Sequence, residues 1–130
     1  MSRENVEVAL QVMDALSRRD ASALVSLADP DVQWHSLFAM GDHFSGYDGT
    51  RRYMSDLDDA WEVGRADVED SLAVGDLVVM VGRIHYRGRA GGTESETPVL
   101  WLLKFREGRV LRFRAFRDPE QALEAVGLRE

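Results

Sequence analysis

The sequence contains no cysteine and only three prolines among its 130 residues. Without cysteine, the chain has no disulfide, no thiolate nucleophile and no cysteine-bound metal site, and this composition fits a reducing compartment. No apolar run approaches the roughly 20 residues that span a bilayer. The first residues lead into an amphipathic pattern rather than the apolar core of a signal peptide. These absences predict a cytoplasmic protein without a membrane segment.

The chain also has fewer basic residues than acidic residues. The chain has 16 Lys and Arg against 23 Asp and Glu, which gives a formal net charge of -7. Nucleic acid and anionic membranes would repel such a chain at long range. Five arginines do cluster late in the sequence, but alternation along a strand divides them between two faces. We therefore expect neither nucleic acid nor a membrane as a partner.

The opening half has the period of amphipathic helices. Apolar residues recur at three- and four-residue spacing between positions 6 and 16, which predicts a helix that starts at Ser2 and ends near position 18. Asp20 is a suitable cap for a short second helix. That helix should stop at Asp29-Pro30, because the residue before proline avoids helical geometry.

The middle of the chain predicts a short strand, a loop and a third helix. The strand covers residues 32–37 and the glycine-rich loop residues 39–49. Asp48 is expected to cap the third helix. Its apolar face would carry Tyr53, Met54, Leu57 and Trp61.

The closing half predicts strands. They are expected at residues 66–74, 77–87, 98–105 and 110–116, with tight turns at Gly75-Asp76 and Glu107-Gly108. A short helix at residues 120–126 would end the chain. Helices followed by strands indicate one α+β domain over residues 1–130, in which a curved sheet folds around a helix-covered interior.

Three segments in this order of elements carry a family resemblance: ADPDVQWH at residues 28–35, FSGYDG at 44–49 and RAFRD at 114–118. Together they resemble the SnoaL-like branch of the nuclear transport factor 2-like superfamily, which is related to the ketosteroid isomerases. The resemblance implies a cone-shaped barrel, with a curved, mostly antiparallel sheet wrapped around the N-terminal helices. It also implies an apolar pocket inside the cone and a homodimer packed through the sheet.

The resemblance supplies catalytic candidates residue by residue. Where ketosteroid isomerases have a carboxylate base this chain has His35, and where they have the oxyanion-hole tyrosine and aspartate it has about Val12 and Trp101. An isomerase of that kind is not expected. SnoaL-like cyclases have an acid/base carboxylate near the end of the last strand, and Asp118 is similar in position.

Each catalytic candidate also has a structural interpretation. His35 titrates near neutral pH and is a candidate acid/base, or else a histidine that lines the pocket or the core. Asp118 is a candidate acid/base, or a cap for the C-terminal helix. Arg114 would pair with Asp118 or with an anionic substrate group inside the cone, or else face solvent or a dimer partner. His35, His43 and His85 match no ligand spacing, so no metal is expected.

Aromatic residues are the candidates for ligand binding. They would suit a flat hydrophobic compound, with core packing as the alternative for most of them: Trp34, Trp61, Tyr53, Trp101, Phe105 and Phe116. Alternation predicts that Trp101 and Phe105 face inward. Leu100 and Leu102 would then face outward, as in a dimer contact.

Two functions remain open from the sequence. One is a cofactor-independent acid/base enzyme of the cyclase, isomerase or dehydratase type, which acts on a polyketide- or steroid-like carbonyl compound. The other is a noncatalytic homodimer that binds a small hydrophobic molecule or serves as a scaffold. Neither requires a cofactor.

Overall fold

A computed structural model describes residues 2–35, 44–88 and 92–117. The helices in these ranges are α1 (Ser2–Arg18), α2 (Ala21–Leu27) and α3 (Gly46–Ala60). The strands are β1 (Ala28–His35), β2 (Phe44–Ser45), β3 (Trp61–Val74), β4 (Leu77–Gly88), β5 (Ser95–Arg106) and β6 (Arg109–Phe116). The order of helices and strands is the predicted one except for β2, which lies in the segment 39–49 that was predicted to be a loop. Both Asp118 and the expected helix at 120–126 lie outside the described residues.

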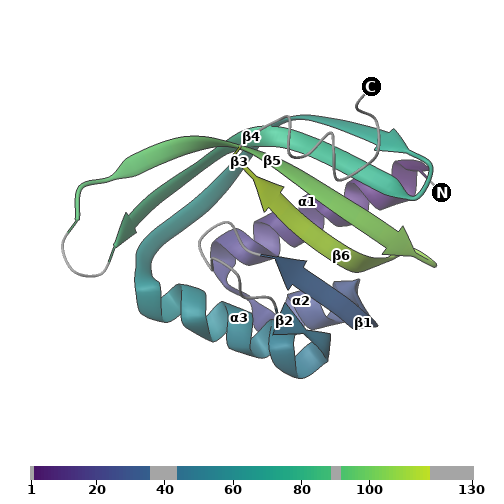
Figure 1. Cartoon of the computed structure of the whole chain (residues 1–130), viewed down its shortest axis with the longest axis horizontal. Coiled ribbons are helices and arrows are strands. Elements are labelled where there is room, and N and C mark those ends of the chain that lie inside the picture. The colour runs from purple at the N-terminus through teal and green to yellow at the C-terminus, as the bar shows by residue number, and fades with distance from the viewer. Residues whose placement is uncertain (1, 36–43, 89–91, 118–130) are drawn as a thin grey trace.

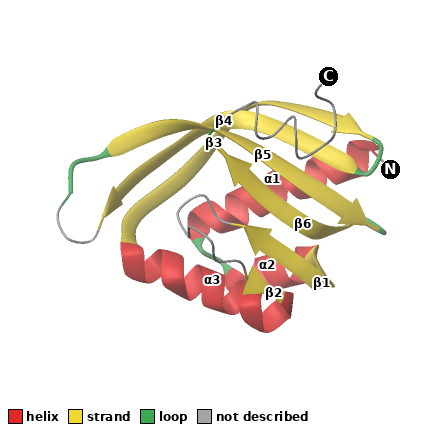
Figure 2. Cartoon of the chain, in the orientation of Figure 1, coloured by secondary structure: helices red, strands yellow, loops and turns green. Residues whose placement is uncertain are grey.

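The strands form one six-stranded sheet in the order β2-β1-β6-β5-β4-β3. The pair of β1 and β6 is parallel, and the other neighbouring pairs are antiparallel. Figure 1 shows the sheet curled strongly, with α1 inside the curl. Figure 2 shows the helices gathered on this concave side. The predicted α+β cone with a mostly antiparallel sheet is thus confirmed.

Two helices, α1 and α3, enclose the interior of the cone. α1 crosses the concave face beside β3, where the hydroxyl of Ser17 accepts a hydrogen bond of 3.0 Å from the N–H of Ala66. α3 follows β2 directly and leads directly into β3, so it connects the two edge strands of the sheet across its open side (Figure 1). None of the helices in the described ranges combines the length and the apolarity of a membrane span.

Some predicted boundaries were wrong. β1 begins at Ala28 rather than at position 32, and it runs through Pro30. Its pairing with β6 is interrupted between Ala28 and Gln33, and β2 pairs only with Gln33 and Trp34. A proline has no N–H to contribute, so this interruption accommodates it within the strand.

The third helix and the strand after it also differ from the prediction. Ser45 rather than Asp48 occupies the cap position of α3, and Asp48 lies in the first turn. Trp61 is the first residue of β3 and not the last apolar residue of the helix. Its ring packs edge-on against the ring of Tyr86 on β4, with centroids 5.1 Å apart. This contact with the sheet outweighs the helical spacing of Trp61 in the sequence.

The curl of the sheet depends on a close approach between β3 and β4. Their register shifts between Val68 and Asp70, opposite Gly82. A Cβ atom at position 82 would overlap the backbone carbonyl of Asp67. Glycine therefore permits this contact, and the irregularity increases the local twist of the strand.

Trp34 anchors the end of the cone that β1 forms. Its side chain is fully buried, and its ring packs against Tyr53 and Phe113 at centroid distances of 5.9 and 5.3 Å. The indole N–H donates a 2.8 Å hydrogen bond to the hydroxyl of Thr50. That hydroxyl in turn donates to the carbonyl of Gly46 at 2.8 Å. Thr50 thus satisfies a buried donor and links α3 to β1.

Replacement of Thr50 tests this link. Thr50→Val keeps the side-chain shape but removes the acceptor of the buried indole N–H, which should lower the free energy of unfolding by about 1–3 kcal/mol. Thr50→Ser keeps the hydroxyl and should cost less than Thr50→Val. Urea unfolding of the two variants and the wild type measures the difference, and equal stability of the wild type and Thr50→Val would contradict the role of the hydroxyl.

An ion-pair cluster joins β1 to the end of β5. The guanidinium of Arg106 donates to both carboxylate oxygens of Asp29, at 3.0 and 2.6 Å, and to Asp31 at 2.8 Å. The Asp29 side chain is only 10% exposed. Hydrogen bonds from Arg106 and from the N–H of Asp31 hold the pKa of the Asp29 carboxyl below its usual range. The charged form of Asp29 therefore stabilises the fold.

The stability should depend on pH accordingly. Because the folded pKa of Asp29 is depressed, its contribution is present above the unfolded pKa of ~3.9 and is lost as the pH falls through the folded value. Asp29→Asn should lower the free energy of unfolding at pH 7 by roughly 1 kcal/mol. The gap between variant and wild type should narrow as acid is added. A gap that stays constant from pH 7 to the acid transition would contradict this account, and urea titrations at several pH values measure it.

Candidate functional site

A cavity lies between α1, α3 and the concave face of the sheet. Its volume is about 70 Å³. Six aliphatic or thioether side chains contribute to its wall: Met13, Leu16, Leu57, Ala66, Ile84 and Ala115. Residues from two helices and four strands thus meet there, in the part of the cone that the resemblance assigns to a pocket.

Aromatic rings form much of the remaining wall. The aromatic lining residues are Tyr53, Trp61, Tyr86, Trp101 and Phe113. The edge-on pair of Trp61 and Tyr86 offers an apolar surface with a phenol beside it. Such a wall suits a flat organic ring that carries a polar group.

Polar groups in the lining are few. Besides the two tyrosines, the cavity is lined by Ser17, Arg19 and Arg65, with Gly64 between the two arginines in space. Ser17 accepts the hydrogen bond from Ala66. Within the described ranges the lining includes no carboxylate and no imidazole. Apart from Tyr53 and Tyr86, the side chains that commonly serve in general acid/base chemistry are therefore absent from this part of the wall.

Arg19 was missed by the sequence analysis. Its backbone is left-handed, with φ of 56°, directly after the end of α1. Its side chain is 14% exposed and pairs with Asp58 of α3 at 2.9 Å. Arg19 lines both the cavity and an adjoining open groove. The helical periodicity predicts that the first helix ends near position 18, but it does not predict the direction of the Arg19 side chain.

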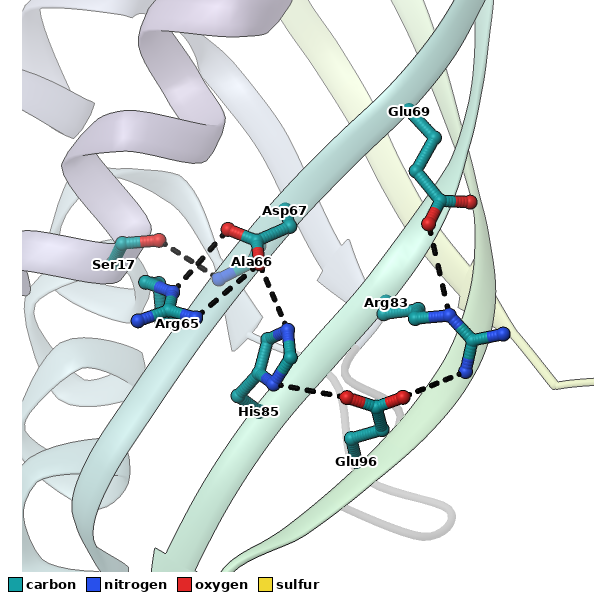
Figure 3. Close-up of polar contacts among 8 residues, drawn as sticks. All are labelled: Ser17, Arg65, Ala66, Asp67, Glu69, Arg83, His85 and Glu96. Atoms are coloured by element: carbon teal, nitrogen blue, oxygen red, sulfur yellow. Dashed lines mark hydrogen bonds and ion pairs between the residues drawn. The ribbon is translucent and has the colours of Figure 1, made fainter.

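A charged cluster lies just outside the cavity on β3, β4 and β5. Figure 3 shows His85 between Asp67 and Glu96, at N–O distances of 2.8 and 3.3 Å. Arg65 also pairs with Asp67, at 3.2 Å. The hydrogen bond from Arg65 is the main cause that lowers the pKa of Asp67, with a smaller contribution from His85.

His85 and Glu96 belong to the outer face of the sheet, whereas Arg65 and Asp67 lie on the edge strand β3 and also line the groove beside the cavity. Arg65 pairs in register with His85, whereas the next pair along the strands, Ala66 with Ile84, lines the cavity. Side chains of successive strand residues point to opposite faces. The imidazole of His85 is therefore separated from the cavity by the sheet.

Three of the predicted ligand-binding residues are brought together at the cavity: Tyr53, Trp61 and Trp101. Trp34 and Phe105 are buried in the core but are not part of the lining. Phe116 pairs with Leu100, one position beyond the inward pair of Trp101 and Ala115, and so lies on the outer face.

The outer face also carries two of the catalytic candidates. His35 pairs in register with Arg114 on β6, next to the inward pair of Trp34 and Phe113. Of the two placements left open for Arg114, alternation favours the outer face, because it directs Phe113 and Ala115 inward instead. Burial, and secondarily the nearby charge of Arg112, lower the pKa of Arg114. The catalytic roles of His35 and Arg114 receive no support from this arrangement and stay predictions, as does that of Asp118.

Solved structures with the same fold extend over almost the whole chain. A protein from Catenulispora acidiphila with a ketosteroid isomerase-like fold, in complex with trimethylamine, is 18% identical; the match covers 95% of this chain and 94% of that one, with a TM-score of 0.79. TerC crystallised with polyporic acid is 21% identical over 95% and 98% of the two chains, with a TM-score of 0.78. A candidate SnoaL-like polyketide cyclase from Jannaschia sp. CCS1 is 19% identical over 99% and 95%, with a TM-score of 0.75.

Sequence comparison points to the same family. No curated protein has a sequence that matches this chain significantly. The family model of the SnoaL-like domain does match, over residues 9–113. This match runs from α1 to β6 and includes every residue that lines the cavity except Ala115. The chain belongs to the SnoaL-like domain family.

Proposed function

We propose that this SnoaL-like domain binds a small, mostly apolar organic compound with a carbonyl or acid group. The observation that carries the proposal is the cavity, whose wall combines aromatic rings with a few polar groups at one end. Binding sites for organic compounds typically have this character. The proposal concerns binding first, because the described part of the lining has no carboxylate or imidazole to act as a general base.

The size of the cavity restricts the ligand. Its 70 Å³ is less than the ~150 Å³ of an apolar cavity that takes up benzene. A ligand with even one ring must therefore shift side chains or extend from the cavity into the open groove that shares Ser17, Arg19 and Gly64 with it. A single ring that displaces lining side chains or lies partly in the groove, with its polar substituent toward the groove, suits the chemistry of the wall.

Related folds support an organic ligand without fixing its identity. One neighbour was crystallised with polyporic acid and another with trimethylamine. These compounds differ in charge, so the fold alone does not decide which ligand is bound. The side chains at the cavity of this chain must do so.

Turnover of a bound carbonyl compound is a second candidate function, favoured by the family match and by the polyketide cyclase-type neighbour. It would be cofactor-independent acid/base chemistry of the cyclase, isomerase or dehydratase type. His35→Ala and Asp118→Ala would each then reduce turnover at least tenfold in folded protein. Binding without consumption of the compound would leave a noncatalytic ligand-binding or scaffolding protein.

Filling the cavity tests the binding proposal. Ala115→Leu adds apolar volume inside the cavity and should abolish binding, whereas Ala60→Leu makes the same change at the exposed end of α3. A compound at about a hundredfold its dissociation constant adds roughly 2.7 kcal/mol of stability. We expect thermal-shift screens against aromatic acids, phenols, lactones and terpenes to give a hit that Ala60→Leu retains and Ala115→Leu loses. The same shift in both variants would place the ligand elsewhere and contradict the proposal.

A homodimer through the outer face of the sheet is the second part of the proposal. The support is an outer apolar patch, defined as Leu72, Val74, Val79, Val81 and Leu100, whose members occupy neighbouring outward positions on β3, β4 and β5. Leu72, Val74 and Val81 are 63%, 50% and 39% exposed. A second copy that covers the same patch by two-fold symmetry would bury these side chains.

Light scattering after size exclusion tests the dimer. The wild type should have about twice the 14.6 kDa mass of one chain. Leu72→Lys should shift the mass toward that of a monomer, because it places a charge in the apolar contact. Leu10→Lys makes the same change at an exposed leucine of α1 and should remain dimeric. A wild-type monomer, or an unchanged mass of Leu72→Lys, would contradict this interface.

A further inference from the structure

Arg19 occupies a backbone position that favours glycine. The N–H of Arg19 donates to the carbonyl of Leu16 at 3.1 Å, and the N–H of Asp20 donates to that of Ala15 at 2.9 Å. This pair of bonds is the Schellman ending of a helix, in which the left-handed residue is most often glycine because a Cβ atom is unfavourable there. In this protein the left-handed residue at the helix end is Arg19, with φ of 56°. Strain of this kind is found preferentially where a side chain has a function.

The left-handed backbone directs the Arg19 side chain along the mouth of the cavity. Its Nη2 atom lies 3.1 Å from where a Cβ atom of residue 64 would be, so a larger residue at position 64 would displace the end of the guanidinium by a few tenths of an ångström. The side chain is only 14% exposed. The Arg19 guanidinium, which is paired with Asp58 and lies close to Gly64, is thus placed at the junction of cavity and groove.

Arg19 is paired with one carboxylate, and the adjoining groove is also lined by Asp14, Glu62 and Asp67. One hydrogen bond from the Arg19 guanidinium is recorded within the described residues, from Nη1 to Asp58 at 2.9 Å. The Asp58 side chain is 61% exposed and so is largely solvated. A guanidinium has five N–H donors, and it binds planar anions in a two-pronged geometry. Donors therefore remain to bind an anionic oxygen that enters from the groove.

We propose that Arg19 is the residue through which the cavity selects an anionic ligand. The class of ligand is a small aromatic acid, whose ring packs against Trp61 and Tyr86 while its carboxylate accepts hydrogen bonds from Arg19. This inference rests on the proposed binding function and adds the charge of the ligand to it. A carboxylate that accepts hydrogen bonds from the guanidinium donors that Asp58 does not use gains charge-assisted hydrogen bonds, which favours the anion over a neutral compound of the same shape.

A purely structural role makes different predictions. If Arg19 served to tie α1 to α3 through Asp58, its loss would destabilise the fold and affect neutral and anionic ligands alike. If it serves recognition, replacement by glycine relieves the left-handed backbone. The thermal midpoint of Arg19→Gly should then be equal to or above that of the wild type.

Calorimetric titration with benzoate and with neutral benzamide tests the inference. The wild type should bind benzoate at least tenfold more tightly than benzamide, and Arg19→Gly should remove this preference with little change for benzamide. Arg19→Gln, which keeps a long polar side chain, should behave in the same way and serves if the glycine variant does not fold. Arg18→Gln removes the same charge from the adjacent, 55% exposed arginine and should retain the preference.

The outcomes separate the two proposals. Binding of neither compound by the wild type would overturn the proposed function and this inference with it. Equal binding of both compounds by the wild type would overturn only the inference. It would also be overturned if Arg18→Gln lost the preference as fully as Arg19→Gly, because the general charge of the surface would then explain the effect. Loss of the preference in the Arg19 variants alone, at unchanged thermal stability, supports recognition by Arg19.

Discussion

The alternation of side chains along one curled sheet decides which residues can reach the cavity. Trp101, Phe113 and Ala115 point into the cone, and the residues between them, Leu102 and Arg114, point away from it. A shift of one residue in the pairing of β6 would exchange these sets. The buried ring of Trp34 packs against Phe113 and thereby favours the observed register. Chemistry inside the cone therefore depends on how β1, β5 and β6 are aligned.

Much of the fold could be predicted because its signals are local or periodic. The helical spacing of α1, the turns at Gly75-Asp76 and Glu107-Gly108, and the inward stripe of Val99, Trp101, Leu103 and Phe105 were all confirmed. The boundaries that failed depend on tertiary contacts. Trp61 fits the helical period of α3, yet its packing against Tyr86 assigns it to β3. Pro30 signals a helix stop, but only the interrupted pairing of β1 explains why a strand passes through it.

The site was less predictable than the fold. Aromatic content pointed correctly to Tyr53, Trp61 and Trp101 as lining residues, since large rings in a small domain must gather somewhere. The resemblance suggested His35 and Arg114, but family positions do not reveal which way a side chain faces. Arg19 could not be found at all, because its importance comes from a left-handed backbone and from the space above Gly64. Both are properties of the folded backbone rather than of the sequence pattern.

Some of the polar contacts that stabilise the fold lie away from the cavity. The hydrogen bonds of Trp34 with Thr50 and of Arg106 with Asp29 fasten β1 to α3 and β5, and none of these four residues lines the cavity. Tyr53, Trp101 and Phe113 belong to both the core and the cavity wall, so only the less buried lining residues can change without loss of the scaffold. This partial separation of stabilising contacts from the cavity is consistent with a family whose members share architecture and differ in ligand.

The most direct test of the central claim is a crystal structure of the protein grown with benzoate. We expect density for the ring between α1 and the concave face of the sheet, against Trp61 and Tyr86, with the carboxylate in contact with the Arg19 guanidinium. A structure in which the cavity stays empty while benzoate occupies the outer face of the sheet would contradict the account.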